Sequence, residues 1–289
     1  MMRWCLSLFL VLWSLCGLGQ ADSLYEHAQV AYEAGQYQKA EDLLSQGLKL
    51  ERTHYDCLKL RGDVRNRQSN FESALRDYNK AEKLQSQDPA LYRSRGAALL
   101  SLYRTREAIK DFDRAVELDP QNPLGYYNRG TAYFVQGNYH KAVKEFDRAL
   151  ELNTNDADAY FVRGAALCEL QDFKKGLADL NKANTMQPDN REMALHLAVM
   201  QFEAGEYKTA ILALTKIIDS SDSEAEMAEA YYYRGQAKKA LKNKVGACKD
   251  WTEAAQLGDD DSRALVAGYC EKDKDPASRK PRRKAEIVF

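Results

Sequence analysis

Apolar positions recur along this chain with a period of 34 residues. The dipeptide Arg-Gly marks the period at Arg61, Arg95, Arg129 and Arg163, and another copy at Arg234 arrives three residues late. Small residues fill two later columns, and between them stands a bulky column made of Leu44, Tyr78, Phe112, Phe146, Leu180, Leu214 and Trp251. Small residues around a large one are typical of two helices that cross closely, so each period predicts a helix-turn-helix hairpin.

Seven hairpins are expected, at residues 21–54, 55–88, 89–122, 123–156, 157–190, 191–227 and 228–261. A polar stretch at residues 220–226 has the composition of a loop and explains the late copy. Because one hairpin cannot bury its apolar face alone, the hairpins are expected to stack as a single solenoid over residues 20–270. Residues 262–270 have helical apolar spacing and are expected to cap the last hairpin.

The repeated columns resemble the tetratricopeptide repeat over residues 21–261. The clearest copy carries Tyr126, Gly130, Tyr133, Gly137, Tyr139, Ala142, Phe146 and Ala149, while Pro120 and Pro188 hold the closing proline in two other copies. The resemblance implies an all-α fold, a right-handed α-solenoid of about seven helix-turn-helix repeats with a C-terminal capping helix. It also implies a non-enzymatic scaffold that binds a protein or peptide partner in the concave groove lined by the first helix of each repeat.

Positions that face this groove in the family predict two groups of binding residues. The basic and hydrogen-bonding group is Lys59, Asn66, Arg67 and Arg93, which suits acidic groups of a partner. The apolar group is Tyr127, Phe134, Phe161, Leu195 and Phe202. Clustered aromatic residues are unusual on a surface unless a partner covers them, and they make strong interface anchors. The alternative is that these aromatic residues pack between adjacent first helices as part of the core.

Acidic residues follow the arginines of the Arg-Gly column at a spacing of sixteen positions. Repeats one and six lack the arginine, and they also lack the acid. We therefore expect structural ion pairs between the two helices of a repeat, or across to the next repeat. The expected pairs are Arg61 with Asp77, Arg95 with Asp111, Arg129 with Glu145, Arg163 with Asp179, and Arg234 with Asp250.

Motifs for catalysis and metal binding are missing from the sequence. It has no glycine-rich phosphate loop, no Gly-x-Ser-x-Gly and no His-Glu-x-x-His. Its four histidines are scattered and its cysteines lack Cys-x-x-Cys spacing, which disfavours a zinc site. We expect no enzyme activity, no cofactor and no metal. Cys248 and Cys270 either form a disulfide in an oxidising compartment or remain buried thiols.

The first nineteen residues differ from the rest of the chain. Arg3 precedes an apolar run from Trp4 to Leu18, which is shorter than the roughly 20 residues of a membrane-spanning helix but suits a signal peptide. Small residues predict cleavage after Gly19. The chain resembles exported proteins of the Bacteroidetes type, and we expect it in the periplasm or at the outer membrane. An uncleaved anchor and a lipoprotein attached at Cys16 are the alternatives.

Charge is nearly balanced over the 289 residues, with 42 basic and 43 acidic side chains. This balance argues against a body that coats nucleic acid. The last part of the chain, residues 271–289, is basic and rich in proline and is expected to be disordered, so the repeat body is acidic. The tail supports an alternative function, an envelope tether on anionic lipid or polymer. Membrane contact is expected only through this tail or an uncleaved N-terminus.

Overall fold

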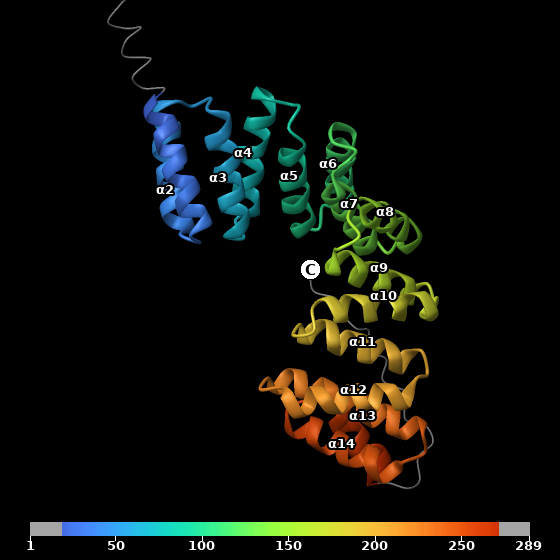
Figure 1. The fold of residues 1–289 in the computed structure, drawn as a ribbon. Helices are drawn as coiled ribbons and strands as arrows, with labels where there is room; N and C mark the ends of the chain where they lie inside the picture. Colours follow the sequence, from blue (N-terminus) through green and yellow to red (C-terminus); the bar gives the residue numbers. More distant parts are fainter. Residues whose placement is uncertain (1–18, 272–289) are drawn as a thin grey trace, which may run out of the picture. The chain divides into compact units, whose positions relative to one another are not determined.

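The computed structural model describes residues 19–271, where all regular secondary structure is helical (Figure 1). The predicted signal peptide lies outside this part of the chain except for Gly19, and so does the basic tail except for Glu271. No helix within the described range is long and apolar enough to cross a membrane.

Contacts divide the chain into two compact units, one ending at Thr154 and the next beginning at Asn155. The first unit contains a helix at residues 19–33, followed by α2 (Tyr37–Leu50), α3 (Tyr55–Arg67), α4 (Phe71–Leu84), α5 (Pro89–Ser101), α6 (Thr105–Leu118), α7 (Pro123–Val135) and α8 (Tyr139–Leu152). The second contains α9 (Ala157–Glu169), α10 (Phe173–Met186), α11 (Arg191–Glu203), α12 (Tyr207–Ser220), α13 (Glu224–Ala240), α14 (Lys244–Gln256), α15 (Asp260–Leu265) and η1 (Val266–Cys270), a π-helical turn.

Buried apolar side chains form a separate cluster in each unit. The cluster of the first unit runs from Ala28 to Ala132, and that of the second from Ala198 to Leu265. The first unit contains four hairpins, and the second contains three hairpins with the cap.

Local sequence explains where the helices begin and turn. Asp88 and Asn122 cap α5 and α7 with side-chain hydrogen bonds, and proline follows each cap at the first helical position. The turn inside each hairpin needs a residue with positive φ. Glycine supplies it in three repeats, at Gly35, Gly137 and Gly205, because it has no Cβ to clash in that conformation.

The bulky column packs onto the small residue of the Arg-Gly column within each hairpin. A Cβ added to Gly62 would lie 2.4 Å from the ring of Tyr78, and one added to Gly96 would lie 2.5 Å from the ring of Phe112. The knobs Tyr78, Phe112, Phe146 and Trp251 are almost fully buried as a result. The small and bulky columns of the sequence therefore correspond to a close helix crossing.

The polar stretch at residues 220–226 is not a loop throughout. The connection comprises only residues 221–223, because α12 runs to Ser220 and α13 starts at Glu224 with Ser223 as its cap. The inserted residues lengthen α13 to 17 residues, against 13 in α11. The first helix of the seventh repeat thus begins before residue 228, and the cap begins at Asp260 rather than 262.

Candidate functional site

All five expected arginine–acid pairs are present in the structure. Arg95 donates from Nε and Nη2 to the two carboxylate oxygens of Asp111, both at 2.8 Å. Within each pair, the nitrogen–oxygen distances lie between 2.6 and 3.0 Å for Arg61–Asp77, Arg129–Glu145, Arg163–Asp179 and Arg234–Asp250. In each pair two guanidinium nitrogens donate to one carboxylate. These charge-assisted hydrogen bonds fix the plane of the guanidinium between the two helices of the repeat.

Several of these arginines also reach back to the preceding repeat. The remaining nitrogen Nη1 of Arg129 donates to Asp113 at 2.8 Å, and Nη1 of Arg95 donates to Asn79 and Glu82. Arg61 and Arg234 make the equivalent contacts to Ser45 and Thr215. The sequence left open whether pairing occurs within or between repeats. The structure contains both, because one planar guanidinium can serve three helices.

The environment of these arginines makes them structural. Their side chains are only 12–20 % exposed. The ring of a tyrosine three residues earlier lies 5.2–5.7 Å from the guanidinium carbon in four repeats. Burial acts to lower the pKa of Arg95, but the hydrogen bonds that Arg95 donates to the carboxylates of Asp111 and Glu82 raise it overall. The guanidinium groups of these arginines are therefore already paired within the fold, which favours a structural role over partner binding.

The first helices of neighbouring repeats contact one another, α3 with α5 and α5 with α7 in the first unit, and α11 with α13 in the second. The predicted basic group lies on two of them. Lys59 and Asn66 are half-buried on α3, Arg67 is exposed at its end, and Arg93 is half-buried on α5. The structure thus brings this group onto adjacent helices of one unit.

These basic side chains differ in how far they are already paired. Lys59 Nζ lies 3.2 Å from Asp63, one helical turn away. Arg67 Nε lies 3.4 Å from the Tyr32 hydroxyl, a contact that raises the arginine pKa. Arg93 has no hydrogen-bond or ion-pair partner among the described side chains. Arg93 and Arg67 are consequently the cations of this group most available to a partner. We call Asn66, Arg67 and Arg93 the basic patch.

The apolar group is divided between the two units. Tyr127 and Phe134 lie half-buried on α7, where Phe134 meets Tyr139 edge to face with ring centroids 5.3 Å apart. Leu195 and Phe202 lie half-buried on α11, and the Phe202 ring is 5.7 Å from those of Tyr207 and Tyr233. The rings of Phe134 and Phe202 therefore pack within their own hairpin or against the next one and remain partly exposed.

Phe161 was predicted as a binding anchor, and the structure corrects this. Its side chain is 7 % exposed on α9, because the ring of His196 on α11 covers it at a centroid distance of 5.1 Å. For Phe161, the alternative interpretation as core holds. His196 could not be identified from the repeat pattern, because the equivalent positions of the other repeats do not carry histidine.

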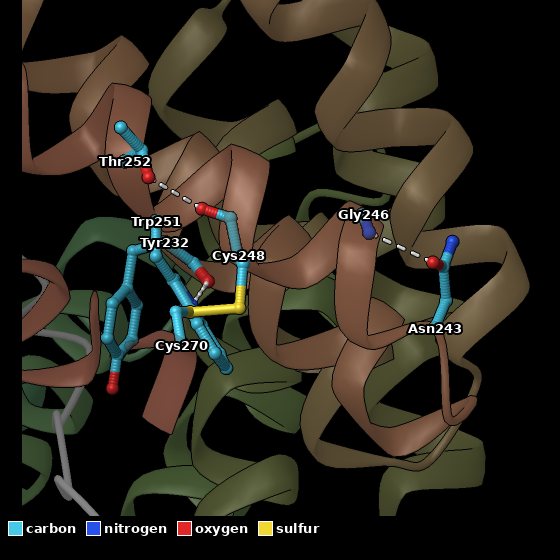
Figure 2. Close-up of a disulfide and its surroundings, with 7 residues drawn as sticks. All are labelled: Tyr232, Asn243, Gly246, Cys248, Trp251, Thr252 and Cys270. Atoms are coloured by element: carbon cyan, nitrogen blue, oxygen red, sulfur yellow. Dashed lines mark hydrogen bonds between the residues drawn. A yellow bond between two sulfur atoms is a disulfide. The ribbon is translucent and has the colours of Figure 1, made fainter. Parts of the chain in front are cut away.

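Cys248 on α14 and Cys270 at the end of η1 form a disulfide, with Cα atoms 5.7 Å apart (Figure 2). The bond lies beside Trp251, whose indole nitrogen donates to the carbonyl of Tyr232. Cys57 and Cys168 are buried free thiols, and burial raises the pKa of each to about 12. Within the described residues, no cluster of histidine, cysteine and carboxylate side chains could hold a metal ion.

Stacked helical hairpins whose first helices share a face define the class of helical-repeat scaffolds. Family models agree with this class. One model of the tetratricopeptide repeat matches residues 123–156, a TPR repeat model matches 104–137, and a further tetratricopeptide repeat model matches 25–89 and 166–225. Together they match more than half of the sequence. The chain belongs to the tetratricopeptide repeat family, whose members are in general non-enzymatic scaffolds for protein–protein interaction.

Solved structures share the fold at low sequence identity. A tetratricopeptide repeat protein from Parabacteroides merdae is 22 % identical with a TM-score of 0.63, covering 86 % of this chain and 98 % of its own. The C-terminal part of a TPR repeat-containing protein from Cytophaga hutchinsonii is 17 % identical with a TM-score of 0.64, covering 83 % and 98 %. YrrB, described as a TPR protein with an unusual peptide-binding site, is 24 % identical with a TM-score of 0.57, covering 66 % and 96 %. No curated protein matches the chain.

Proposed function

We propose that this chain is an exported scaffold that binds a protein or peptide partner on the face formed by its first helices. The observation that carries the proposal is the basic patch on α3 and α5. Arg93 has no hydrogen-bond or ion-pair partner within residues 19–271, and Arg67 is exposed one repeat away. Two cations on adjacent helices suit a partner segment that carries acidic side chains.

Half-buried aromatic residues supply the apolar part of the proposed contact. Phe134 on α7 belongs to the same unit as the basic patch. Phe202 on α11 is likewise half-buried, and it belongs to the other unit. Partly exposed aromatic side chains make strong anchors, because on binding they bury a large surface area with little loss of side-chain conformational freedom. The peptide-binding site named for YrrB supports a peptide as the class of ligand.

Export is part of the proposal. The Cys248–Cys270 disulfide supports it, because disulfides persist in oxidising compartments and are rare in reducing ones. The apolar run from Trp4 to Leu18 supports it as well, since its length is that of a signal-peptide core. The proposed location is the periplasm or the outer membrane of a bacterial cell.

Affinity capture from the native organism, followed by charge reversal, tests the binding face. Partners captured by the wild-type chain are identified by mass spectrometry, and capture is repeated with Arg67→Glu/Arg93→Glu. We expect at least about a tenfold loss of the captured partner, because like charges then face its acidic segment. The matched control is Arg106→Glu, which reverses an exposed arginine on α6, a second helix, and should capture normally.

Two results would count against the proposal. One is unchanged capture by the Arg67→Glu/Arg93→Glu variant when its helical circular dichroism equals that of the wild type. The other is loss of capture on truncation after Glu271, since this variant keeps both arginines and removes only the basic tail. The second result would favour the envelope tether instead.

A further inference from the structure

In several repeats, two aromatic rings meet where the first helix turns into the second. Tyr32 meets Tyr37 at 5.8 Å between ring centroids, and Phe202 meets Tyr207 at 5.7 Å. The seventh repeat has Lys239 and Lys244 at these two positions. The seventh repeat therefore has two ammonium groups where those repeats have two rings, and Nζ of Lys239 lies 5.7 Å from the ring centroid of the buried Trp251.

The cap places an aromatic ring beside these two lysines. Tyr269 of η1 lies with its centroid 4.6 Å from Nζ of Lys239 and 5.3 Å from Nζ of Lys244. It also meets Trp251 edge to face at 5.6 Å. Cations over a ring face and an aromatic edge contact are both favourable, so Lys239, Lys244 and Trp251 form a site for one aromatic side chain. We call these three residues the tyrosine socket.

Cys270 adjoins the tyrosine that fills the socket. Its disulfide to Cys248 on α14 closes a loop with a sequence separation of 22 residues. The cap itself is short, since α15 has six residues and η1 has five, and Leu265 is its only buried apolar side chain. Because the cap has one buried apolar side chain, the disulfide is expected to supply a large part of the free energy that holds the cap in place.

We propose that the Cys248–Cys270 disulfide is a redox latch that holds Tyr269 in the tyrosine socket, and that its reduction releases the cap and opens the socket. Both cysteine residues are half-buried rather than fully buried. A dithiol attacks one sulfur and displaces the other as a thiolate, and its second thiol then releases the protein from the mixed disulfide. Two electrons and two protons pass to the cysteines, and the dithiol becomes a disulfide.

Amide hydrogen exchange of the full chain, followed by mass spectrometry, tests the latch. The oxidised protein is compared with protein treated with dithiothreitol. We expect exchange in residues 260–270 to rise by more than about tenfold on reduction, because the loop-closing constraint is lost. Residues 191–240 should keep their protection. The Cys248→Ser/Cys270→Ser variant should exchange rapidly in this segment with or without dithiothreitol.

Equal exchange in residues 260–270 before and after reduction overturns the latch. Loss of protection across α11–α13 together with the cap also overturns it, since the disulfide would then stabilise the repeats in general. Variants of the oxidised chain test the socket. Tyr269→Phe keeps the ring and should keep the protection, whereas Tyr269→Ala should lose part of it. Equal loss in both variants would show that the ring contacts with the lysines do not hold the cap.

Discussion

Single side chains set the distance between the two helices of each hairpin. Gly62, Gly96 and Gly130 face the rings of Tyr78, Phe112 and Phe146, and no Cβ fits between them. Repeats one and six carry Ala28 and Ala198 instead, and there the knob is leucine, at Leu44 and Leu214. In these repeats the size of the small residue and the size of the knob compensate one another, because the interior is close-packed. Repeat five differs, since it combines Gly164 with Leu180.

Gly96→Ala should lower the free energy of unfolding by about 1–2 kcal/mol. The added Cβ would lie 2.5 Å from Phe112, and this overpacking outweighs the better helix propensity of alanine. Gly96→Ala/Phe112→Leu reproduces the pair found in repeats one and six, so it should recover part of the loss. Urea unfolding followed by circular dichroism measures both. A double variant less stable than Gly96→Ala would show that the two residues do not compensate.

At the scale of the element, the paired arginines of repeats two, three and four in the first unit, and of repeat seven in the second, also contact the preceding repeat. Repeat six has no such arginine, because it carries Leu197 and Ala213 at the two positions of the pair. Leu197 is 6 % exposed, so an apolar contact replaces the ion pair at this place. Repeat one has no preceding second helix within the described residues and has His27 in the arginine column. The arginine–acid pair is thus present in repeats two, three, four, five and seven, and repeat six shows that apolar packing can replace it.

Asp179→Ala should destabilise the second unit by about 3 kcal/mol, because it removes the carboxylate that accepts two hydrogen bonds from the largely buried Arg163. Arg163→Leu/Asp179→Ala copies the residues of repeat six and should cost much less. Thermal and urea unfolding of the two variants supplies the comparison. If the double variant is as unstable as Asp179→Ala, the cost does not arise from an unsatisfied guanidinium.

At the scale of the whole molecule, acid should weaken the fold through a buried histidine. His196 packs against Phe161, its Nε2 atom is buried without a hydrogen-bond partner, and burial lowers its pKa to about 4. An unfolded histidine takes up a proton below about pH 6.5, whereas the folded one does so only near pH 4. The stability is therefore complete above pH 6.5 and is lost as the pH falls from 6.5 to 4.

The expected loss attributable to His196 is about 2 kcal/mol between pH 8 and pH 5. Urea unfolding at the two pH values measures it as the difference between the wild type and His196→Val, which carries the valine found at Val162 in the preceding repeat. His140→Val, at an exposed position on α8, is the control and should behave as the wild type does. Equal pH dependence of the wild type and His196→Val would exclude this role.

Most of the fold and part of the site could be derived from residue spacing. The arginine–acid pairs and the knob contacts each involve two residues at a fixed distance within one repeat, so a periodic pattern is enough to find them. Burial of Phe161 could not be derived in this way, because it depends on His196 in the next repeat. The position of Tyr269 could not be derived either, because it depends on a cap that is not one of the repeats.

The sequence by itself determined the helical hairpins, their order and the contacts inside them, since a 34-residue period imposes the same local geometry in each copy. Tertiary structure alone decided which inner-face side chains stay accessible, how α13 absorbs the inserted residues, and where the cap binds. The physical reason is that accessibility is a property of neighbours. The exposure of a side chain depends on which side chains of the adjacent repeat pack against it. The repeat pattern does not record this packing, because the pattern is the same for a covered side chain and for an accessible one.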